Sequence, residues 1–246
     1  TTGINNTLIG GLAGDALTDA DYNTVLGFNA LSADTLGSRA VAIGFEALND
    51  QNFTSATDSY NIAIGFNAGC KVTTGVRNTL IGSKTGDAFT DADYNVALGY
   101  NALTSDTLGS TSTAIGYAAL ETQNFTSATD SYNTAVGYNA GTAVTTGTNN
   151  TLIGGLAGDA ITTGGDNVVV GYTAFGANTT GASNVALGAF ALDANTTASN
   201  NTAVGTSSLG ANTTGAGNTG IGRVALLANT TGADNVALGY RALNAN

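Results

Sequence analysis

Short apolar runs recur along the chain, and each one ends at a glycine. The first four are "TLIG", "TVLG", "VAIG" and "IAIG", followed by polar or glycine-rich segments. Runs of this length between glycine corners are typical of short β-strands, because a buried helix needs a longer periodic stretch. No run approaches the roughly 20 apolar residues of a membrane-spanning helix, so we expect no membrane insertion.

The runs repeat with a fixed period. Their glycines are 17 residues apart, except for two steps of 21 residues, from Gly44 to Gly65 and from Gly116 to Gly137. A fixed period of this size is the sequence signature of a repeat architecture. The fourteen repeat glycines, which we expect to be structural, are Gly10, Gly27, Gly44, Gly65, Gly82, Gly99, Gly116, Gly137, Gly154, Gly171, Gly188, Gly205, Gly222 and Gly239.

A longer duplication explains the two long steps. The segment "QNFTSATDSYN" starts at Gln51 and again at Gln123, and "GDALTDADYN" recurs as "GDAFTDADYN". This 72-residue duplication covers residues 10–153, and plain 17-residue repeats follow over residues 154–246. We therefore expect one repeat domain over residues 1–246, as a segment of a longer fibre.

The columns of the repeat become readable when each unit is numbered from its Asn. Position 1 is Asn in twelve of fourteen units, with Ala40 and Ser112 as the exceptions, and position 5 is the glycine. Positions 2 and 4 are Thr, Val, Ile or Leu, position 3 is mostly Ala, position 8 is Ala in twelve units, and position 9 is Leu, Phe or Gly. Residues two apart face the same side of a strand. We therefore expect positions 2 and 4 to face inward and position 3 to face outward.

A 17-residue unit cannot bury its own apolar face, but stacked units can. The pattern predicts an all-β chain: a parallel β-solenoid (β-roll) of about fourteen 17-residue coils. Each coil is expected to contribute two short strands, with coils about 4.8 Å apart. The Asn side chains should hydrogen-bond from coil to coil. The glycine is expected where a positive φ, or close approach to the next coil, excludes a Cβ. The absence of Pro fits a ladder in which interior N–H groups are used.

Composition excludes several functions. The net charge is −11 with only six basic residues, which argues against nucleic-acid binding. There is no His and one Cys, so Ser–His and Cys–His catalytic arrangements are ruled out. A carboxylate pair, as in glycosidases, is the remaining catalytic option, and no pair stands out. We expect a non-enzymatic protein, with Cys70 as a buried or half-buried thiol.

The repeats resemble those of a known family. "NTAVGTSSLGANTTGAG" and "NVALGYRALNAN" are similar to the head repeats of YadA-type trimeric autotransporter adhesins and to repeat arrays of phage tail-fibre proteins. The unit of 17 residues and the 21-residue steps differ from the adhesin-head pattern. The resemblance implies a left-handed β-roll and a side-by-side homotrimer. It also implies an extracellular location on a cell or virion surface, and attachment to a host receptor or surface glycan as part of a structural fibre.

Position 6 carries an aromatic column that supports association independently. An exposed apolar strip of this length would exceed what soluble monomers usually tolerate, so we expect it to lie in an interface. The alternative is a stacking platform for sugars. The column consists of Phe28, Phe45, Phe66, Tyr100, Tyr117, Tyr138, Tyr172 and Tyr240.

The two 21-residue steps predict outward loops, where recognition residues concentrate in repeat proteins. The candidates are Asn52 and Phe53 in the first loop and Asn124 and Phe125 in the second.

Acidic turns offer one further chemistry. Asp19 and Asp21, and their copies Asp91 and Asp93, place carboxylates two residues apart, an arrangement that could hold Ca²⁺. The spacing of known calcium loops is missing, so solvated turns are favoured and no cofactor is expected.

Two alternatives to the fibre or adhesin function stay open. One is a self-assembling extracellular filament without a receptor role. The other is an ice-binding solenoid, suggested by Thr-Thr pairs such as Thr179–Thr180. Adjacent Thr residues in an extended segment point to opposite faces, which disfavours a flat ice-binding array.

Overall fold

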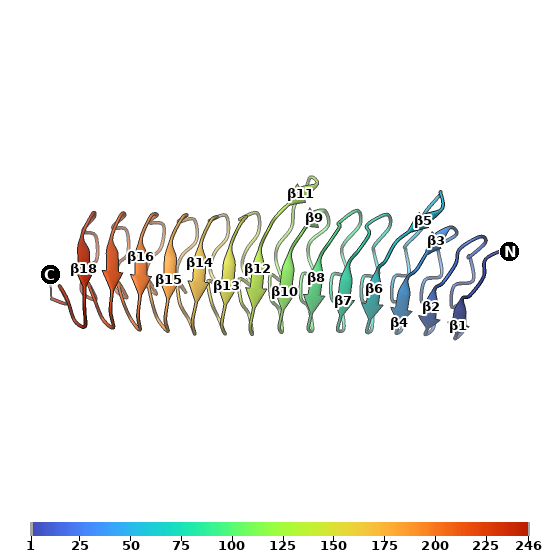
Figure 1. Ribbon diagram of the computed structural model, residues 1–246, viewed down its shortest axis with the longest axis horizontal. Helices are drawn as coiled ribbons and strands as arrows, with labels where there is room; N and C mark the ends of the chain where they lie inside the picture. The colour runs from blue at the N-terminus through green and yellow to red at the C-terminus, as the bar shows by residue number, and fades with distance from the viewer. Residues whose placement is uncertain (1, 246) are drawn as a thin grey trace. The chain divides into compact units, whose positions relative to one another are not determined.

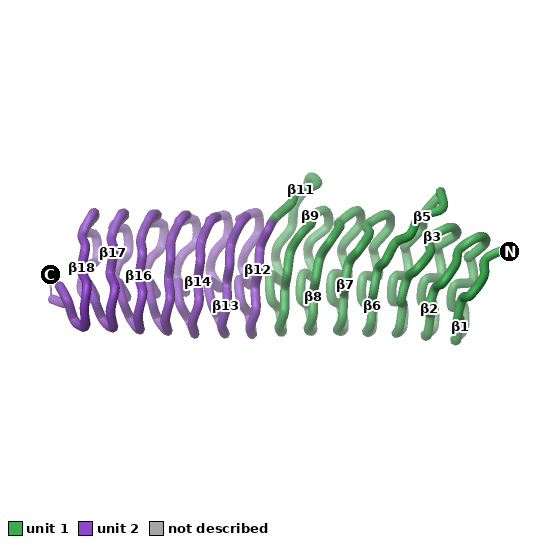
Figure 2. Tube along the Cα trace, in the orientation of Figure 1, with its two compact units in different colours: residues 1–131 green, residues 132–246 purple. Residues whose placement is uncertain are grey.

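The computed structural model describes residues 2–245, and these residues form strands and turns without a helix. These residues therefore contain no helix that is long and apolar enough to cross a membrane. The chain divides into two compact units, residues 1–131 and residues 132–246 (Figure 2). Each unit contains seven turns of a parallel β-solenoid, so the predicted fold class is confirmed.

Unit 1 contains a sheet of seven three-residue strands, with the chain advancing by one strand per coil (Figure 1). Its two inserted loops add two small two-stranded sheets, β3–β5 and β9–β11. The strands of the main sheet are β1 (Thr7–Ile9), β2 (Thr24–Leu26), β4 (Val41–Ile43), β6 (Ile62–Ile64), β7 (Thr79–Ile81), β8 (Val96–Leu98) and β10 (Thr113–Ile115). The small sheets consist of β3 (Gly37–Ser38), β5 (Thr57–Asp58), β9 (Gly109–Ser110) and β11 (Thr129–Asp130).

Unit 2 repeats the main sheet without inserted loops. Its seven strands are β12 (Thr134–Val136), β13 (Thr151–Ile153), β14 (Val168–Val170), β15 (Val185–Leu187), β16 (Thr202–Val204), β17 (Thr219–Ile221) and β18 (Val236–Leu238). In both units a plain coil contributes one strand to the long sheet. The expected second strand per coil is found only at the inserted loops.

Neighbouring strands pair in parallel with every repeat position opposite its own copy. Thr79 lies opposite Val96, for example, and Leu80 opposite Ala97. Since the register is repeat on repeat, each position forms a column of side chains along its unit. Residues of one column therefore share the same position relative to the core and the solvent.

The side chains of the strands face the opposite way from our sequence-based prediction. Position 3 is buried throughout the central coils, as at Val25, Ala63 and Leu80, which are 0% exposed. Positions 2 and 4 face outward, as at Val96 and Leu98, which are 39% and 42% exposed. The reason is the alternation of side chains between the two faces of a strand. The Asn at position 1 is buried, and the two-residue period of a strand places position 3 on the same side.

The buried Asn column forms the predicted ladder. The side-chain oxygen of Asn78 accepts a hydrogen bond from the backbone N–H of Asn95 at 3.0 Å. Its amide donates to the carbonyl of Ala92 at 2.7 Å. The same pattern recurs in unit 2, where Asn167 accepts from the N–H of Asn184 at 3.0 Å. A buried amide that uses both of its ends incurs no desolvation penalty, which explains a polar column inside each solenoid.

The repeat glycines meet both expectations. All fourteen have φ between 119° and 146°. At Gly82, a Cβ would lie 2.6 Å from the carbonyl oxygen of Gly99 in the next coil. Any side chain there would clash with backbone and adopt a disfavoured conformation. Both effects exclude other residues where another coil follows; at Gly239, where a Cβ would meet no atom within 4 Å, the positive φ alone favours glycine.

The remaining core comes from positions 8, 9 and 12. Position 8 is a buried Ala in most coils, and the large side chain comes from either position 9 or position 12. In the coil of β7, Gly86 is at position 9 and the fully buried Phe89 is at position 12. In the next coil, Leu103 is at position 9 and the buried Asp106 is at position 12. This reciprocal choice holds in the thirteen coils whose position 12 is described, and the sequence analysis did not predict it. Cys70 is buried, as predicted.

Candidate interaction surfaces

The outer face of the sheet is the first candidate surface. We define it by the outward side chains at positions 2 and 4 of the strands, together with position 6. In unit 1 it exposes Leu26 at 45% and Leu98 at 42%, and in unit 2 Ile153 at 38% and Ile221 at 39%. The columns at positions 2 and 4 are aliphatic or Thr and repeat in register, so each unit presents a continuous, largely apolar face.

The aromatic column at position 6 of this face is exposed. Its eight rings are between 42% and 64% exposed within the single chain. In unit 1, rings of adjacent coils stack: the ring centroids of Phe28 and Phe45 are 5.7 Å apart and those of Phe45 and Phe66 are 5.3 Å apart. Tyr100 and Tyr117 stack at 5.6 Å. Offset stacking of this kind stabilises the column, but it leaves the outer edges of the rings open to solvent.

The two inserted loops project beyond the edge of the neighbouring coils of unit 1 (Figure 1). At the loop roots, β5 pairs with β3 and β11 pairs with β9. The loop tips are exposed at residues 54–56 and 126–128. The exposed tips, rather than the roots, are therefore the parts available for contact.

Of the recognition candidates, Asn52 and Asn124 are exposed, while Phe53 and Phe125 are only 5% exposed. The rings are buried because they pack against the roots of the loops. A Cβ on Gly37 would lie 2.7 Å from the ring of Phe53. Both phenylalanines therefore anchor their loops. Contact of these rings with a partner would require the loop to open.

A buried carboxylate holds each loop root. Asp34 accepts hydrogen bonds from the N–H of Gly37 at 3.0 Å, the N–H of Phe53 at 3.2 Å and the side-chain amide of Gln51 at 2.6 Å. Asp106 makes the same three bonds in the second loop, to Gly109, Phe125 and Gln123. Burial raises the pKa of the Asp106 carboxyl, although these hydrogen bonds oppose the rise. The carboxylates therefore have a structural role that leaves them inaccessible to a ligand.

A further surface column was not identified from the sequence. The last residue of five successive coils, directly before position 1 of the next coil, is Tyr22, Arg39, Tyr60, Arg77 and Tyr94, and all five are exposed. The guanidinium carbon of Arg39 is 4.8 Å from the centre of the Tyr22 ring and 5.9 Å from that of Tyr60. The corresponding distances for Arg77 are 5.9 Å to Tyr60 and 5.3 Å to Tyr94. The signal in the sequence was the alternation of Tyr and Arg at one repeat position.

This Tyr–Arg column is linked to the first loop. Arg39 forms an ion pair of 3.0 Å with Asp58 of β5, and the hydroxyl of Tyr60 donates to Asp58 at 3.3 Å. In the second loop, Thr111 stands where the first has Arg39, so this ion pair is not repeated there. The column also has positive φ, 62° at Arg39 and 50° at Tyr60. In unit 2 the same column is filled by Asn149, Asp166, Ser183, Asn200, Gly217 and Asp234, mostly residues that tolerate this conformation.

The acidic candidates are engaged with their neighbours. Asp21 accepts from the N–H of Ile4 at 2.7 Å, and Asp93 accepts from the N–H of Val76 at 2.7 Å. Asp19 accepts from the hydroxyl of Thr2, and Asp91 from that of Thr74. Each bond joins a residue to one 17 positions earlier, so these carboxylates tie consecutive coils. Within residues 2–245, no group of three or more metal-ligating side chains comes together.

The Thr pairs do not present two hydroxyls on one surface. At position 13, Thr179 donates to the carbonyl of Thr196 at 3.2 Å, and Thr162 donates to that of Thr179 at 3.0 Å. Their partners at position 14, such as Thr180, are exposed. Because the hydroxyls at position 13 are used along the ladder, a single column of exposed Thr remains. This geometry gives no support to the ice-binding alternative.

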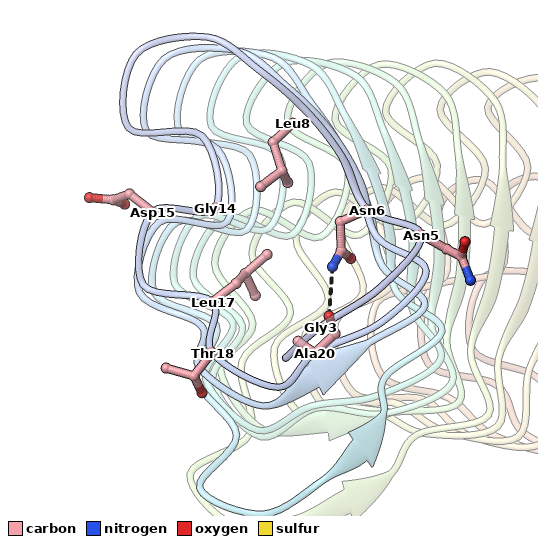
Figure 3. Close-up of a pocket in the computed structure, with 9 residues that line it drawn as sticks. All are labelled: Gly3, Asn5, Asn6, Leu8, Gly14, Asp15, Leu17, Thr18 and Ala20. Carbon is pink, nitrogen blue, oxygen red and sulfur yellow. Dashed lines mark hydrogen bonds between the residues drawn. The ribbon is translucent and has the colours of Figure 1, made fainter. Parts of the chain in front are cut away.

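One cavity is the open interior of the first coil. It measures about 370 Å³ and is lined by residues between Gly3 and Ala20 (Figure 3). The side chains of Leu8 and Leu17 point into it, and Asn6 donates to the carbonyl of Ala20 at 2.6 Å across it (Figure 3). These are the columns that form the core in later coils. The cavity is therefore a continuation of the core pattern, and it contains no new chemical group.

No model of a known protein family matches the chain, and no curated protein matches it in sequence.

Proposed function

We propose that this protein is a structural segment of an extracellular fibre, in which three copies associate side by side through the outer face of the sheet. The fibre belongs to a phage tail or a bacterial surface adhesin and contributes to attachment. The observation that carries the proposal is the exposed apolar outer face with its stacked aromatic column. The repeat resemblance favours three copies and an extracellular location. The proposed role is not enzymatic.

The physical reason for association is the area left exposed. Soluble monomers rarely expose contiguous apolar patches of more than a few hundred Å². The outer face instead continues over every coil of a unit, with large side chains such as Phe45 and Phe66 at 42% and 48% exposure. A stable interface buries about 800 Å² per partner. Because identical columns repeat in register, copies can associate over many coils with the same local contacts.

Attachment is assigned to the features outside this face. The two loops of unit 1 have identical sequences and exposed tips, so a receptor or surface glycan would meet the same chemical group twice. The Tyr–Arg column beside the first loop adds guanidinium and phenol groups. Such groups hydrogen-bond to hydroxyl-rich ligands.

The mass of the purified chain in solution tests the proposed association. We expect light scattering to give three times the chain mass of 24.2 kDa. The double variant Phe45→Glu/Phe66→Glu should dissociate towards the monomer, because it places charges in the interface. Tyr94→Glu is the matched control: Tyr94 is 52% exposed but lies outside the outer face, so the mass should not change. A monomeric wild type would refute the proposal. Open-ended polymers would favour the alternative, a self-assembling filament.

A further inference from the structure

A second pocket lies on the surface of unit 2, and its Phe190 wall borders Tyr172 of the outer face. It measures about 320 Å³ and is formed by the turns that follow β15, β16 and β17. Its lining combines a carboxylate, a hydroxyl, an aromatic ring and an aliphatic chain. The lining residues are Phe190, Asp193, Ser207, Gly210, Ala211 and Leu227.

The carboxylate of Asp193 has neither a hydrogen bond nor an ion pair within residues 2–245. Burial raises its pKa. Asp159, two coils earlier in the same column, has a side-chain oxygen that is inaccessible to solvent and unpartnered. Burial is the main cause of its raised pKa, and the charge of Asp193 adds to the rise. The two carboxylates thus form a partly desolvated pair of like charges without a compensating cation, which is an unfavourable arrangement.

A glycine keeps the space between the carboxylates open. The coil between them has Gly176 at the same position. A Cβ on Gly176 would lie 2.9 Å from Oδ1 of Asp193 and 3.6 Å from Oδ1 of Asp159. Both oxygens therefore flank the space above this glycine. Gly210 leaves a second gap at the pocket itself, where a Cβ would lie 3.1 Å from the side chain of Leu227.

The rest of the pocket is suited to the apolar part of a ligand. Phe190 is 41% exposed, and its ring meets that of Tyr172 edge-on at 5.7 Å and 86°. The basic residues of unit 2 are Arg223 and Arg241. Neither forms an ion pair with Asp193 in the described residues, and the guanidinium of Arg223 is 5.9 Å from the ring of Tyr240. The missing positive charge is therefore not supplied by this unit.

We propose that this pocket binds a primary ammonium group carried on a short apolar stem or ring. The ammonium group pairs with the carboxylate of Asp193, and the apolar part packs on Phe190 and Leu227, which line the same pocket. A cation here offsets the repulsion between Asp193 and Asp159, and the ring of Phe190 adds cation–π attraction. Lysine side chains and amino sugars both carry this group. The inference concerns unit 2 alone and does not depend on the proposed fibre role.

Calorimetric titration of the full chain at pH 7 with butylammonium and with glucosamine tests the proposal. 1-Butanol and N-acetylglucosamine are the neutral probes of matched shape. We expect saturable binding of at least one amine, with a dissociation constant on the order of 1 mM, and none of the neutral probes. Binding of butylammonium alone points to lysine side chains as the source, and binding of glucosamine alone points to amino sugars.

Two variants locate the site. Asp193→Asn should weaken amine binding at least tenfold. Asp234→Asn removes the same charge from an exposed position of unit 2 and should leave the affinity unchanged. Gly210→Val fills the pocket without changing its charge and should also weaken binding at least tenfold. Circular dichroism of each variant confirms that the solenoid is retained.

Three outcomes would overturn the proposal. The first is the absence of saturable binding of either amine. The second is an equal loss of affinity in Asp193→Asn and Asp234→Asn, which would show a general charge effect. The third is Ca²⁺ binding that is lost in Asp193→Asn while neither amine binds, because the carboxylates would then serve a metal ion. None of these outcomes depends on whether the chain forms a trimer.

Discussion

Two adjacent coils of unit 1 fill the same cross-section from opposite sides. In the coil of β7, the large side chain is Phe89 at position 12 and position 9 is Gly86; in the coil of β8, it is Leu103 at position 9 and position 12 is Asp106. The backbone is the same in both, since φ is 54° at Gly86 and 53° at Leu103. Gly86 is therefore required by space rather than by conformation. A Cβ there would lie 2.7 Å from the ring of Phe89.

The difference shows how a narrow solenoid keeps a constant core volume. One large apolar side chain fits per coil, at position 9 or at position 12. When it is at position 12, position 9 is Gly; when it is at position 9, position 12 is Asp, Gln or Asn, which we call the polar cap. Asn195 illustrates the cap in unit 2: it accepts from the N–H of Ala198 at 2.9 Å and donates to the carbonyl of the same residue at 3.3 Å. Four predictions test this comparison, in order of decreasing effect.

Removing the large side chain of a coil should have the largest effect. Phe89→Ala creates a cavity that the stacked coils cannot close, and we expect a loss of about 3–5 kcal/mol in the free energy of unfolding. Phe45→Ala is the control on an exposed ring and should cost less than half as much. Denaturant titration measures both. Equal losses would mean that Phe89 is not part of the packed core.

Breaking the Asn ladder should cost about 1–3 kcal/mol for each buried group left unpaired. Asn78 belongs to the coil with Phe89 and Asn95 to the coil with Leu103, and each makes ladder bonds to its neighbours. We therefore expect Asn78→Ala and Asn95→Ala to lower the thermal midpoint by similar amounts. A large difference between them would show that the ladder depends on the coil type.

Placing two large side chains in one coil should also destabilise it. Gly86→Leu forces the new side chain against Phe89 and should cost about 1–3 kcal/mol through overpacking. Combining it with Phe89→Asn converts the coil to the other type and should recover much of the loss, with a coupling of about 0.5–3 kcal/mol. Additive effects of the two changes in a double-mutant cycle would contradict the reciprocal packing.

The polar cap of the Leu103 coil should give the smallest effect and depend on pH. Burial raises the pKa of Asp106 in the folded state. Folding therefore favours the protonated carboxyl over the charged one. The contribution of Asp106 to stability should therefore grow as the pH falls through this raised pKa. Asp106→Asn should flatten the stability profile between pH 7 and pH 4 relative to the wild type. A profile of Asp106→Asn that is as steep as that of the wild type would assign the pH dependence to other carboxyls.

The sequence alone determined the solenoid, its period, the glycine column and the Asn ladder. These features depend on backbone geometry that repeats with each coil, so the glycine occurs fourteen times in the chain and the Asn twelve times. The sequence also contained the information on which strand residues face inward, since a buried Asn at position 1 requires position 3 to be buried. Our prediction instead placed the larger aliphatic residues of positions 2 and 4 inside.

Only the tertiary structure decided which side chains share a cavity or a surface. The exclusion between positions 9 and 12, as at Gly86 and Phe89, arises because the turn folds both positions into one limited volume. The pocket at Asp193 depends in the same way on glycines in neighbouring coils, and the Tyr–Arg column depends on the register that places Arg39 between two rings. Such contacts join residues 17 or more positions apart. Their distances are set by how the coils stack, which a pattern read along one strand does not contain.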